Sequence, residues 1–334
     1  MITLGQVGLG YWGPNLLRNF QRLPEARIKA VCDLDERALA RAREQYPRLI
    51  CTTRPEDLFL DPEIDAVIVT TSAGTHFPVA QAALEAGKDV FVEKPIALKV
   101  EEAEKMVHIA GASGLILMVG HLLLYHPAVT HLKEMVDEGK LGDIYYVYTE
   151  RRNLGKVRQD ENAMWSLAPH DISVALHLLG EMPVMVAAQG QAYLQPDLED
   201  TVFFTLRFAD GRLVHSHVSW LDPHKVRRLT VVGSQQMAVF DDVEPAEKLR
   251  IYDKGVDRTP EYSSYGDALT LRFGDIYVPN IEMREPLRLE CQHFLDCVEQ
   301  REQPLSDGQN GLQVLRILDA LQQSLDNEGR LVYI

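Results

Sequence analysis

Two ionisable side chains stand where they could move a proton. Lys94 follows Glu93 at the end of the apolar run Val90 to Val92, and Pro95 restricts its backbone to extended conformations. An ammonium group can donate a hydrogen bond to a substrate oxygen and stabilise negative charge developing on it. His170 carries an imidazole, which with a pKa near about 6.5 can accept a proton at neutral pH. The two roles exchange if burial lowers the pKa of Lys94.

A glycine-rich turn near the N-terminus predicts how Lys94 is positioned. The apolar segment Thr3 to Val7 predicts a strand, a helical segment follows, and between them lie Gly8, Gly10 and Gly13. In a dinucleotide-binding unit these glycines permit a tight turn, close approach of a pyrophosphate, and close packing of helix on strand. Parallel strands in such a sheet end at the ligand crevice, so we expect Lys94 beside a cofactor.

The residue after the second predicted strand bears on cofactor choice. Asp33 follows the segment Ile28 to Cys32, and a carboxylate there can bind both ribose hydroxyls of NAD while repelling the 2′-phosphate of NADP. Arg37 lies close enough to weaken this preference, so NAD is expected and NADP remains the alternative. For His76 the open choice is a site role or a capping or packing role at the start of the predicted helix Pro78 to Ala86. The expected cofactor contacts are Gly8, Gly10, Tyr11, Trp12, Gly13, Asp33, Arg37, Thr70, Thr71, Ser72, His76, Glu93 and Lys94.

Length and composition exclude several classes of function. A chain of 334 residues suits two cores, and 46% hydrophobic with 25% charged residues is ordinary for a globular protein. A net charge of −15 disfavours nucleic acid as a partner. The four cysteines lack a C-x-x-C or cysteine–histidine pattern, so we expect no metal. With no membrane-length apolar run and no signal-peptide pattern at the N-terminus, we expect a cytoplasmic location.

One basic stretch departs from the acidic balance. Arg151, Arg152, Lys156 and Arg158 fall within eight residues that contain no acid. Such a cluster could bind an anionic group, for example the diphosphate of a nucleotide sugar. The alternative is a solvated surface loop.

The chain resembles the Gfo/Idh/MocA family of sugar and inositol oxidoreductases. The resemblance rests on VGLGYWG, CDLD, TTSAGTH, AALEAGKDVFVEKP, EPLRLECQHFLDC and PLSDGQNGLQVL, and therefore covers nearly the whole chain. It implies an α/β fold, with a Rossmann doubly wound parallel sheet in residues 1–120 and an α+β domain with a large, mostly antiparallel open sheet in residues 121–334. In this family the open face of that sheet carries substrate, and the other face often forms the interface of a homodimer or homotetramer.

The second half of the chain shows the alternation of long strands. The turn signal Asp210 with Gly211 predicts a hairpin between two of them. We expect the helices Pro169 to Leu179 and Glu290 to Gln300 to cover this sheet. We expect Val256 to Asp275 to run over the surface, where it could also cover a site. The predicted strands are Asp143 to Thr149, Val184 to Gln189, Thr201 to Phe208, Arg212 to Ser219, Arg228 to Val232 and Met237 to Phe240.

The resemblance also assigns residues to the substrate. It implies that His170 is the catalytic histidine and Lys94 its partner. Many family members carry an aspartate where this chain has Ser166, which leaves proton transfer to His170 and Lys94. The expected substrate contacts are His121, Tyr125, Arg151, Arg152, Asn153, Arg158, Trp165, Ser166 and His170.

Within the family, the runs GYWGPNLLRN and NLGKVR resemble dehydrogenases of nucleotide sugars. This implies NAD-dependent oxidation of a secondary alcohol, at C3 of a UDP-activated amino sugar. The alternatives are a free sugar or inositol dehydrogenase and a non-catalytic NAD-sensing regulator. Retention of both Lys94 and His170 disfavours the regulator, because binding alone needs neither.

Overall fold

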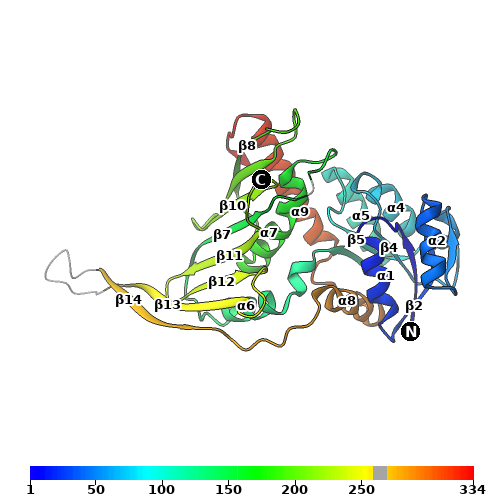
Figure 1. Ribbon diagram of the computed structural model, residues 1–334, viewed down its shortest axis with the longest axis horizontal. Coiled ribbons are helices and arrows are strands. Elements are labelled where there is room, and N and C mark those ends of the chain that lie inside the picture. The colour runs from blue at the N-terminus through cyan, green and yellow to red at the C-terminus, as the bar shows by residue number, and fades with distance from the viewer. Residues whose placement is uncertain (156, 259–268) are drawn as a thin grey trace. The chain divides into compact units, whose positions relative to one another are not determined.

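The computed structural model describes residues 1–155, 157–258 and 269–334, and the chain divides into two compact units (Figure 1). The first unit contains Met1–Tyr125 and Arg284–Arg316, and the second contains His126–Met283 and Ile317–Ile334. The sequence predicted a continuous first domain ending near Gly120. The observed first unit also includes a segment from near the C-terminus, which sequence order alone does not indicate.

The first unit is built on a six-stranded parallel sheet with the order β3-β2-β1-β4-β5-β6. This order reverses between β1 and β4, and the carboxyl ends of strands at such a switch point form the ligand crevice of a doubly wound fold. Its strands are β1 (Ile2–Val7), β2 (Ala26–Cys32), β3 (Ile50–Thr52), β4 (Ala66–Val69), β5 (Asp89–Glu93) and β6 (Leu117–Gly120). Its helices are α1 (Gly13–Gln21), α2 (Glu36–Gln45), α3 (Glu56–Phe59), α4 (Ala73–Glu85), α5 (Val100–Ser113), the 3₁₀ turn η1 (Leu122–Tyr125) and α8 (Pro286–Gln300).

Helix α8 packs in the first unit, against α1, β1 and η1. Three aromatic rings hold this packing together: Phe20 of α1, Phe91 of β5 and Phe294 of α8 meet edge to face, with centroids 5.6 to 6.3 Å apart. Such pairs add stability beyond the area they bury. The prediction that Glu290 to Gln300 covers the second sheet was therefore wrong, because an amphipathic pattern shows that a helix has a buried face but not which sheet buries it.

The second unit is built on a nine-stranded sheet with the order β14-β13-β12-β11-β7-β10-β9-β8-β15. Its named pairs are antiparallel except β7 with β10, which confirms the predicted mostly antiparallel sheet. Its strands are β7 (Ile144–Arg152), β8 (Met185–Gln191), β9 (Thr201–Arg207), β10 (Leu213–Ser219), β11 (Val226–Gly233), β12 (Met237–Asp241), β13 (Leu249–Arg258), β14 (Leu269–Tyr277) and β15 (Val332–Tyr333). Its helices are α6 (Pro127–Asp137) and α7 (Ala163–Leu179), and α9 (Gly308–Asp326) runs from the first unit into the second.

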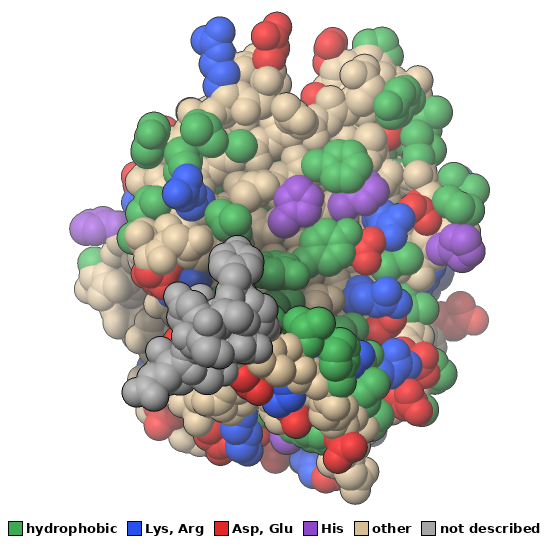
Figure 2. Space-filling model, turned by 90° about the vertical axis from the view of Figure 1, so that its left-hand side faces the viewer, with side chains coloured by type: hydrophobic (Ala, Val, Ile, Leu, Met, Phe, Trp, Pro, Cys, Tyr) green, Lys and Arg blue, Asp and Glu red, His purple; other side chains and the backbone are tan. Residues whose placement is uncertain are grey.

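Helix α7 covers one face of the nine-stranded sheet, where it contacts β7, β9 and β10. The other face is open and carries Tyr146, Phe203 and Leu213, which are 46%, 45% and 41% exposed. Histidines lie among these rings: Phe203 stacks on His217 at 4.0 Å, and Tyr148 stacks on His215 at 6.0 Å. Figure 2 shows a face of the molecule on which hydrophobic side chains and histidines lie close together.

The segment predicted as a surface excursion forms strands where the structure describes it. Val256 to Arg258 belong to β13, and Leu269 to Asp275 belong to β14. The two strands pair and extend together beyond the other strands (Figure 1). Residues 259–268 of that prediction lie outside the described residues. Leu269, Leu271 and Phe273 alternate along β14 and were a usable strand signal, although all three side chains are exposed and mark no buried face.

Candidate functional site

The glycine turn of the first unit has the geometry that a pyrophosphate needs. Gly8 has φ of +103°, and a Cβ there would lie 2.6 Å from the backbone of Thr70. A Cβ at Gly13 would collide with the carbonyl oxygen of Gly8. In contrast, a Cβ at Gly10 would meet nothing within 4 Å, so the backbone is open to an approaching group there. The turn also leads into the N-terminus of α1, whose backbone N–H groups favour an anion.

Asp33 lies beside this turn, at the carboxyl end of β2. Its carboxylate accepts hydrogen bonds from the backbone N–H of Leu9 at 2.5 Å and of Asp35 at 2.8 Å. These bonds fix the carboxylate next to the glycine turn, where a ribose would lie in a dinucleotide site. Arg37 and Tyr11, which belong to the same unit, have exposed side chains.

Buried polar side chains brace the turn from behind. Thr70 donates its hydroxyl hydrogen to the carbonyl oxygen of Gly8 at 2.6 Å. Gln6 donates from its amide to the carbonyl oxygens of Gly8 and Gly13 at 3.0 and 2.9 Å. The structure thus places Thr70 in support of the turn. Sequence reasoning did not select Gln6, although a glutamine inside an otherwise apolar strand was a usable signal.

His76 connects the two loops that follow β4 and β5. Its Nδ1 lies 2.7 Å from the carbonyl oxygen of Pro95, and its Nε2 lies 3.1 Å from that of Thr71. Burial lowers the pKa of His76, and the charge of Lys94 lowers it further, although the two carbonyl contacts oppose this shift. The ring therefore ties the backbone next to Lys94 to the Thr71 and Ser72 loop.

Lys94 is joined to the glycine turn through Glu93. The backbone N–H of Lys94 donates to Oε2 of Glu93 at 3.2 Å, and the indole of Trp12 also hydrogen bonds to the Glu93 carboxylate. Burial raises the pKa of Glu93 to about 7, while Lys94 and Trp12 oppose the rise. Gly120, at the end of β6, leaves room for this carboxylate, because a Cβ there would lie 2.9 Å from Oε2. A direct contact between Trp12 and Glu93 was not foreseen from the sequence.

The two linker residues of the first unit occupy different environments. His121 is buried, and its Nδ1 lies 2.7 Å from Oδ1 of Asn310. Burial lowers the pKa of His121 to about 4, and the nearby charge of Lys94 contributes. The ring is therefore neutral at physiological pH and lies in the electrostatic neighbourhood of Lys94. The Tyr125 hydroxyl is buried 2.8 Å from Oγ of Ser306, which makes it part of the packing of this unit rather than an exposed group.

In the second unit, α7 positions the predicted histidine. Asn162 caps the helix, accepting a hydrogen bond from the N–H of Trp165 at 3.1 Å, and the Trp165 indole donates to Gln322 at 2.9 Å. The helix therefore begins at Ala163, before the predicted start at Pro169. Ser166 and His170, one turn apart, are both partly exposed on α7. Both residues thus lie on the helix that covers one face of the sheet, and their contact with a substrate stays a prediction.

The predicted cationic cluster is divided between the two faces of the sheet. Adjacent residues on a strand point in opposite directions, so Arg151 faces α7 while Arg152 faces the open side. Arg151 is buried and donates to both carboxylate oxygens of Asp171, at 2.8 to 3.2 Å. Arg152 is bound by Glu150 at 2.5 Å and by Asp222.

The remaining described residues of this stretch do not form an unpaired basic surface either. Arg158 has Glu161 at 3.6 Å, and Asn153 follows β7 with its N–H bound to the carbonyl oxygen of Ser219 at 3.2 Å. Lys156 lies outside the described residues. The three arginines of the basic stretch are therefore paired with acids, most of which lie far from them in the sequence, and binding of an anionic group by this stretch stays a prediction.

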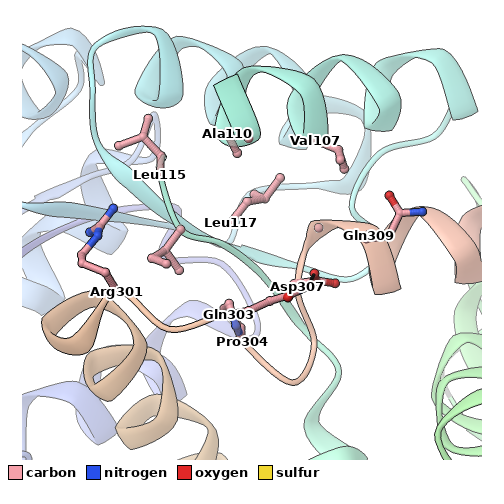
Figure 3. Close-up of a pocket in the computed structure, with 12 residues that line it drawn as sticks. Val107, Ala110, Leu115, Leu117, Arg301, Gln303, Pro304, Asp307 and Gln309 are labelled. Atoms are coloured by element: carbon pink, nitrogen blue, oxygen red, sulfur yellow. Dashed lines mark hydrogen bonds between the residues drawn. The ribbon is translucent and has the colours of Figure 1, made fainter. Parts of the chain in front are cut away.

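A separate hollow of about 280 Å³ lies in the first unit, near the amino ends of the strands rather than the carboxyl ends that carry the glycine turn (Figure 3). It is lined by Leu115 to Leu117, at the start of β6, and by Arg301 and Asp307. The Arg301 guanidinium is held by Asp89 at the start of β5, at 2.6 and 3.0 Å. Since the glycine turn and Lys94 lie at carboxyl ends of strands, this hollow is not part of the candidate cofactor site.

The strand order, the glycine turn, the fixed Asp33 carboxylate and the helix N-terminus define an oxidoreductase-type dinucleotide-binding unit joined to a second α+β unit. The chain belongs to the GFO/IDH/MocA oxidoreductase family. Residues 2–121 match the family model described as oxidoreductase family, NAD-binding Rossmann fold, and residues 129–239 match the GFO/IDH/MocA C-terminal domain. Among the described residues, no helix has the length and apolar character needed to cross a membrane.

Individual relatives have different named activities. UDP-N-acetylglucosamine 3-dehydrogenase of Acidithiobacillus ferrooxidans is 28% identical, over 93% of each chain, and its solved structure gives a TM-score of 0.82 over 98% of each chain. Myo-inositol 2-dehydrogenase of Thermotoga maritima is 25% identical over 98% of this chain and 97% of its own. A 2,7-anhydro-N-acetylneuraminate hydratase of Escherichia coli is 30% identical over 75% of this chain and 70% of its own.

Proposed function

We propose that the protein is an NAD-dependent dehydrogenase that oxidises a secondary alcohol of a sugar substrate. The observation that carries this proposal is the linkage of Gly8 turn, Trp12, Glu93 and Lys94 in one unit. The backbone of Lys94 is bonded to a carboxylate that Trp12 of the turn also contacts, and the charge of the Lys94 ammonium acts on the same carboxylate. A binding protein needs the turn, but it has no need of an amine held beside it.

The proposed chemistry gives a separate role to each of the predicted residues. NAD, when bound, supplies the acceptor for the hydride that leaves the alcohol carbon. Lys94 donates a hydrogen bond to the alcohol oxygen and stabilises its developing negative charge. His170, a partly exposed imidazole on α7, accepts the hydroxyl proton, and Ser166 one turn earlier binds a neighbouring hydroxyl. Their roles exchange if Lys94 loses its proton in the complex.

Replacing Lys94 tests this assignment. Lys94→Ala is expected to lower kcat by at least about a hundredfold, within the usual contribution of a positioned acid–base group. NAD affinity, measured by quenching of tryptophan fluorescence, is expected to change less than about twofold. Lys99→Ala, on an exposed residue of the same segment, is the matched control and should behave as wild type. Turnover by Lys94→Ala at the wild-type rate would overturn the catalytic assignment.

For the substrate we propose a UDP-activated amino sugar, oxidised at C3. The support is the similarity to UDP-N-acetylglucosamine 3-dehydrogenase over 93% of each chain. The ion pairs of Arg151 and Arg152 give no further support, so a free sugar or inositol remains the alternative, favoured by the similarity to an inositol dehydrogenase. NADH formation should be measured with UDP-N-acetylglucosamine, N-acetylglucosamine and myo-inositol. Reduction of NAD by myo-inositol alone would overturn the nucleotide-sugar proposal.

We propose NAD rather than NADP, because the fixed Asp33 carboxylate would repel a 2′-phosphate. Binding of both dinucleotides to wild type and to Asp33→Ser should be measured by fluorescence. We expect wild type to favour NAD, and Asp33→Ser to lose most of that preference. A wild-type preference for NADP would contradict the proposal.

We also propose that two copies of the chain associate through the open face of the nine-stranded sheet. Its exposed Tyr146, Phe203 and Leu213 form an apolar surface of the kind that marks interfaces. Light scattering after size-exclusion chromatography should give a dimer or tetramer, and Phe203→Asp should give smaller species. A wild-type monomer at micromolar concentration would contradict this assembly.

A further inference from the structure

The buried histidine that follows β6 uses only one of its two ring nitrogens. His121 is 1% exposed, and its Nδ1 lies 2.7 Å from Oδ1 of Asn310. No described residue forms a hydrogen bond with its Nε2. His76, in contrast, has a backbone carbonyl oxygen within 3.1 Å of each ring nitrogen. Buried polar groups in native proteins nearly always have a partner, so Nε2 of His121 is expected to meet one from outside the chain.

The contact with Asn310 decides which nitrogen of His121 carries the hydrogen. An amide oxygen can only accept, so Nδ1 of His121 donates to Oδ1 of Asn310 and carries the ring hydrogen. Burial lowers the pKa of His121 to about 4, so at neutral pH the ring has one hydrogen and no charge. A neutral imidazole that donates from one nitrogen accepts at the other. Nε2 of His121 is therefore a hydrogen-bond acceptor.

Asn310 is itself held firmly, in the first turn of α9. Its backbone N–H donates to Oδ1 of Asp307 at 2.7 Å, which caps the helix. The N–H of Val119 in β6 donates to the carbonyl oxygen of Ser306, and the Ser306 hydroxyl donates to the carbonyl oxygen of Val119, both at 2.7 Å. A Cβ at Gly311 would lie 2.6 Å from Cγ2 of Val119, so this turn lies as close to β6 as a glycine permits. The Asn310 oxygen is thus presented to the ring by a fixed backbone.

Strand register brings His121 beside Lys94. Strands β5 and β6 are parallel, with Glu93 opposite Gly120. Lys94 and His121 are the next residue after each, so their backbones leave the carboxyl edge of the sheet side by side. The strands are close here, because a Cβ at Gly120 would lie 2.9 Å from Oε2 of Glu93. The charge of Lys94 also reaches the ring, where it lowers the pKa of His121 further. A substrate oxygen bound by Lys94 would therefore lie near His121.

We propose that Asn310 is a positioning residue that keeps the hydrogen on Nδ1 of His121, so that Nε2 accepts a hydrogen bond from a second hydroxyl of the substrate. This rests on the proposed function of Lys94, which donates to the reacting oxygen. The ammonium and the imidazole together then select a sugar or cyclitol with hydroxyls on adjacent carbons, because one group donates to the first oxygen and the other accepts from the next. In the other tautomer Nε2 would be a donor, and this pairing would be lost.

Two variants of similar size test the tautomer. Asn310→Asp keeps an oxygen acceptor in the same place, and Asn310→Leu removes it. Nitrogen-15 NMR of histidine-labelled protein at neutral pH distinguishes a ring nitrogen that carries hydrogen from one that does not, and the signals lost in His121→Phe identify this ring. We expect hydrogen on Nδ1 in wild type and Asn310→Asp, and a mixture of tautomers in Asn310→Leu. Hydrogen on Nε2 in wild type would refute the proposal.

A double-mutant cycle tests whether Asn310 acts through His121. With UDP-N-acetylglucosamine or myo-inositol, whichever the wild type oxidises, we expect Asn310→Leu to lower kcat/KM about three- to tenfold, as for the loss of one hydrogen bond. NAD affinity should stay within about twofold. His121→Phe should lose as much, and adding Asn310→Leu to it should cost nothing more. Gln309→Leu, at an exposed position in the same turn, is the matched control and should behave as wild type. Additive losses would contradict the proposal.

Asn310→Asp separates this role from packing through its pH profile. A carboxylate beside Nδ1 favours the protonated ring and raises the pKa of His121. Nε2 then gains a hydrogen as the pH falls, so we expect wild-type kcat/KM at alkaline pH and an acidic limb displaced to higher pH, in step with the NMR titration of His121. A limb that stays in place while His121 titrates at higher pH would mean that Nε2 takes no part.

The substrate contact is also tested without turnover. Saturation of the wild type with UDP-N-acetylglucosamine or with myo-inositol should shift the Nε2 signal of His121. If neither probe moves it, the hydroxyl contact is refuted. If a probe moves it but no sugar reduces NAD, only the proposed function fails, because the tautomer and the shift do not depend on hydride transfer.

Discussion

Replacing Arg151 by methionine is expected to destabilise the second unit strongly. The Arg151 guanidinium and the Asp171 carboxylate are 7% and 5% exposed, and three N–H···O contacts of 2.8 to 3.2 Å join them. The variant leaves Asp171 buried and charged without its partner. Removing one member of such a pair costs about 3 to 5 kcal/mol, because the desolvated charge is no longer compensated.

Urea unfolding followed by circular dichroism measures this cost. The double variant Arg151→Met with Asp171→Leu removes both charges and should recover most of the loss. Arg228→Met is the matched surface control, since Arg228 is 45% exposed on β11 and bound to Asp241 at 3.0 Å. We expect it to cost less than about 1 kcal/mol.

The same variants decide whether Arg151 binds substrate. If Arg151→Met unfolds like wild type and weakens binding of a nucleotide sugar, Arg151 is a ligand contact and the ion pair contributes little to stability. If the double variant is as unstable as the single variant, the cost comes from lost packing rather than from an uncompensated charge.

Other predictions concern the glycine turn and the Glu93 carboxylate. Gly13→Ala should lower NAD affinity and reduce the free energy of unfolding by about 1 to 3 kcal/mol, because its Cβ would collide with the Gly8 carbonyl oxygen. Calorimetric titration measures the affinity, and urea unfolding measures the stability. Thr70→Val removes the buried hydroxyl that donates to Gly8 and should cost about 1 to 3 kcal/mol, whereas a loss of NAD binding at full stability would indicate direct contact with the cofactor. Gly120→Ala should displace the Glu93 carboxylate and lower kcat more than NAD affinity. Steady-state kinetics measures kcat, and fluorescence titration measures NAD affinity. A larger loss of NAD affinity than of kcat would mean that Glu93 acts mainly on the cofactor.

Most of the Rossmann unit could be predicted from the sequence. Glycine spacing, the acid after the second strand and the buried run before Lys94 are local signals, and the structure confirms the strand, turn and helix that they predicted. The open antiparallel sheet was also predictable, because strands with one buried face alternate visibly, as β9 and β10 do.

Charge pairing was much less predictable. Arg151 and Arg152 are neighbours in sequence, yet strand geometry sends them to opposite faces, where Asp171 and Asp222 meet them. Nothing in the local sequence indicates which distant acid will be close. A run of like charges therefore predicts a basic patch only if the fold leaves it unpaired.

The sequence by itself determined the family, the dinucleotide turn and the choice of Lys94 and His170 as candidates, because these depend on residue types at fixed local spacing. Only the tertiary structure decided that α8 packs in the first unit and brings Glu290 into the neighbourhood of Glu93. An acid within the apolar stripe of α8 was a visible anomaly in the sequence. Its surroundings were not visible, because the groups that the fold brings near a buried acid come from segments far apart along the chain.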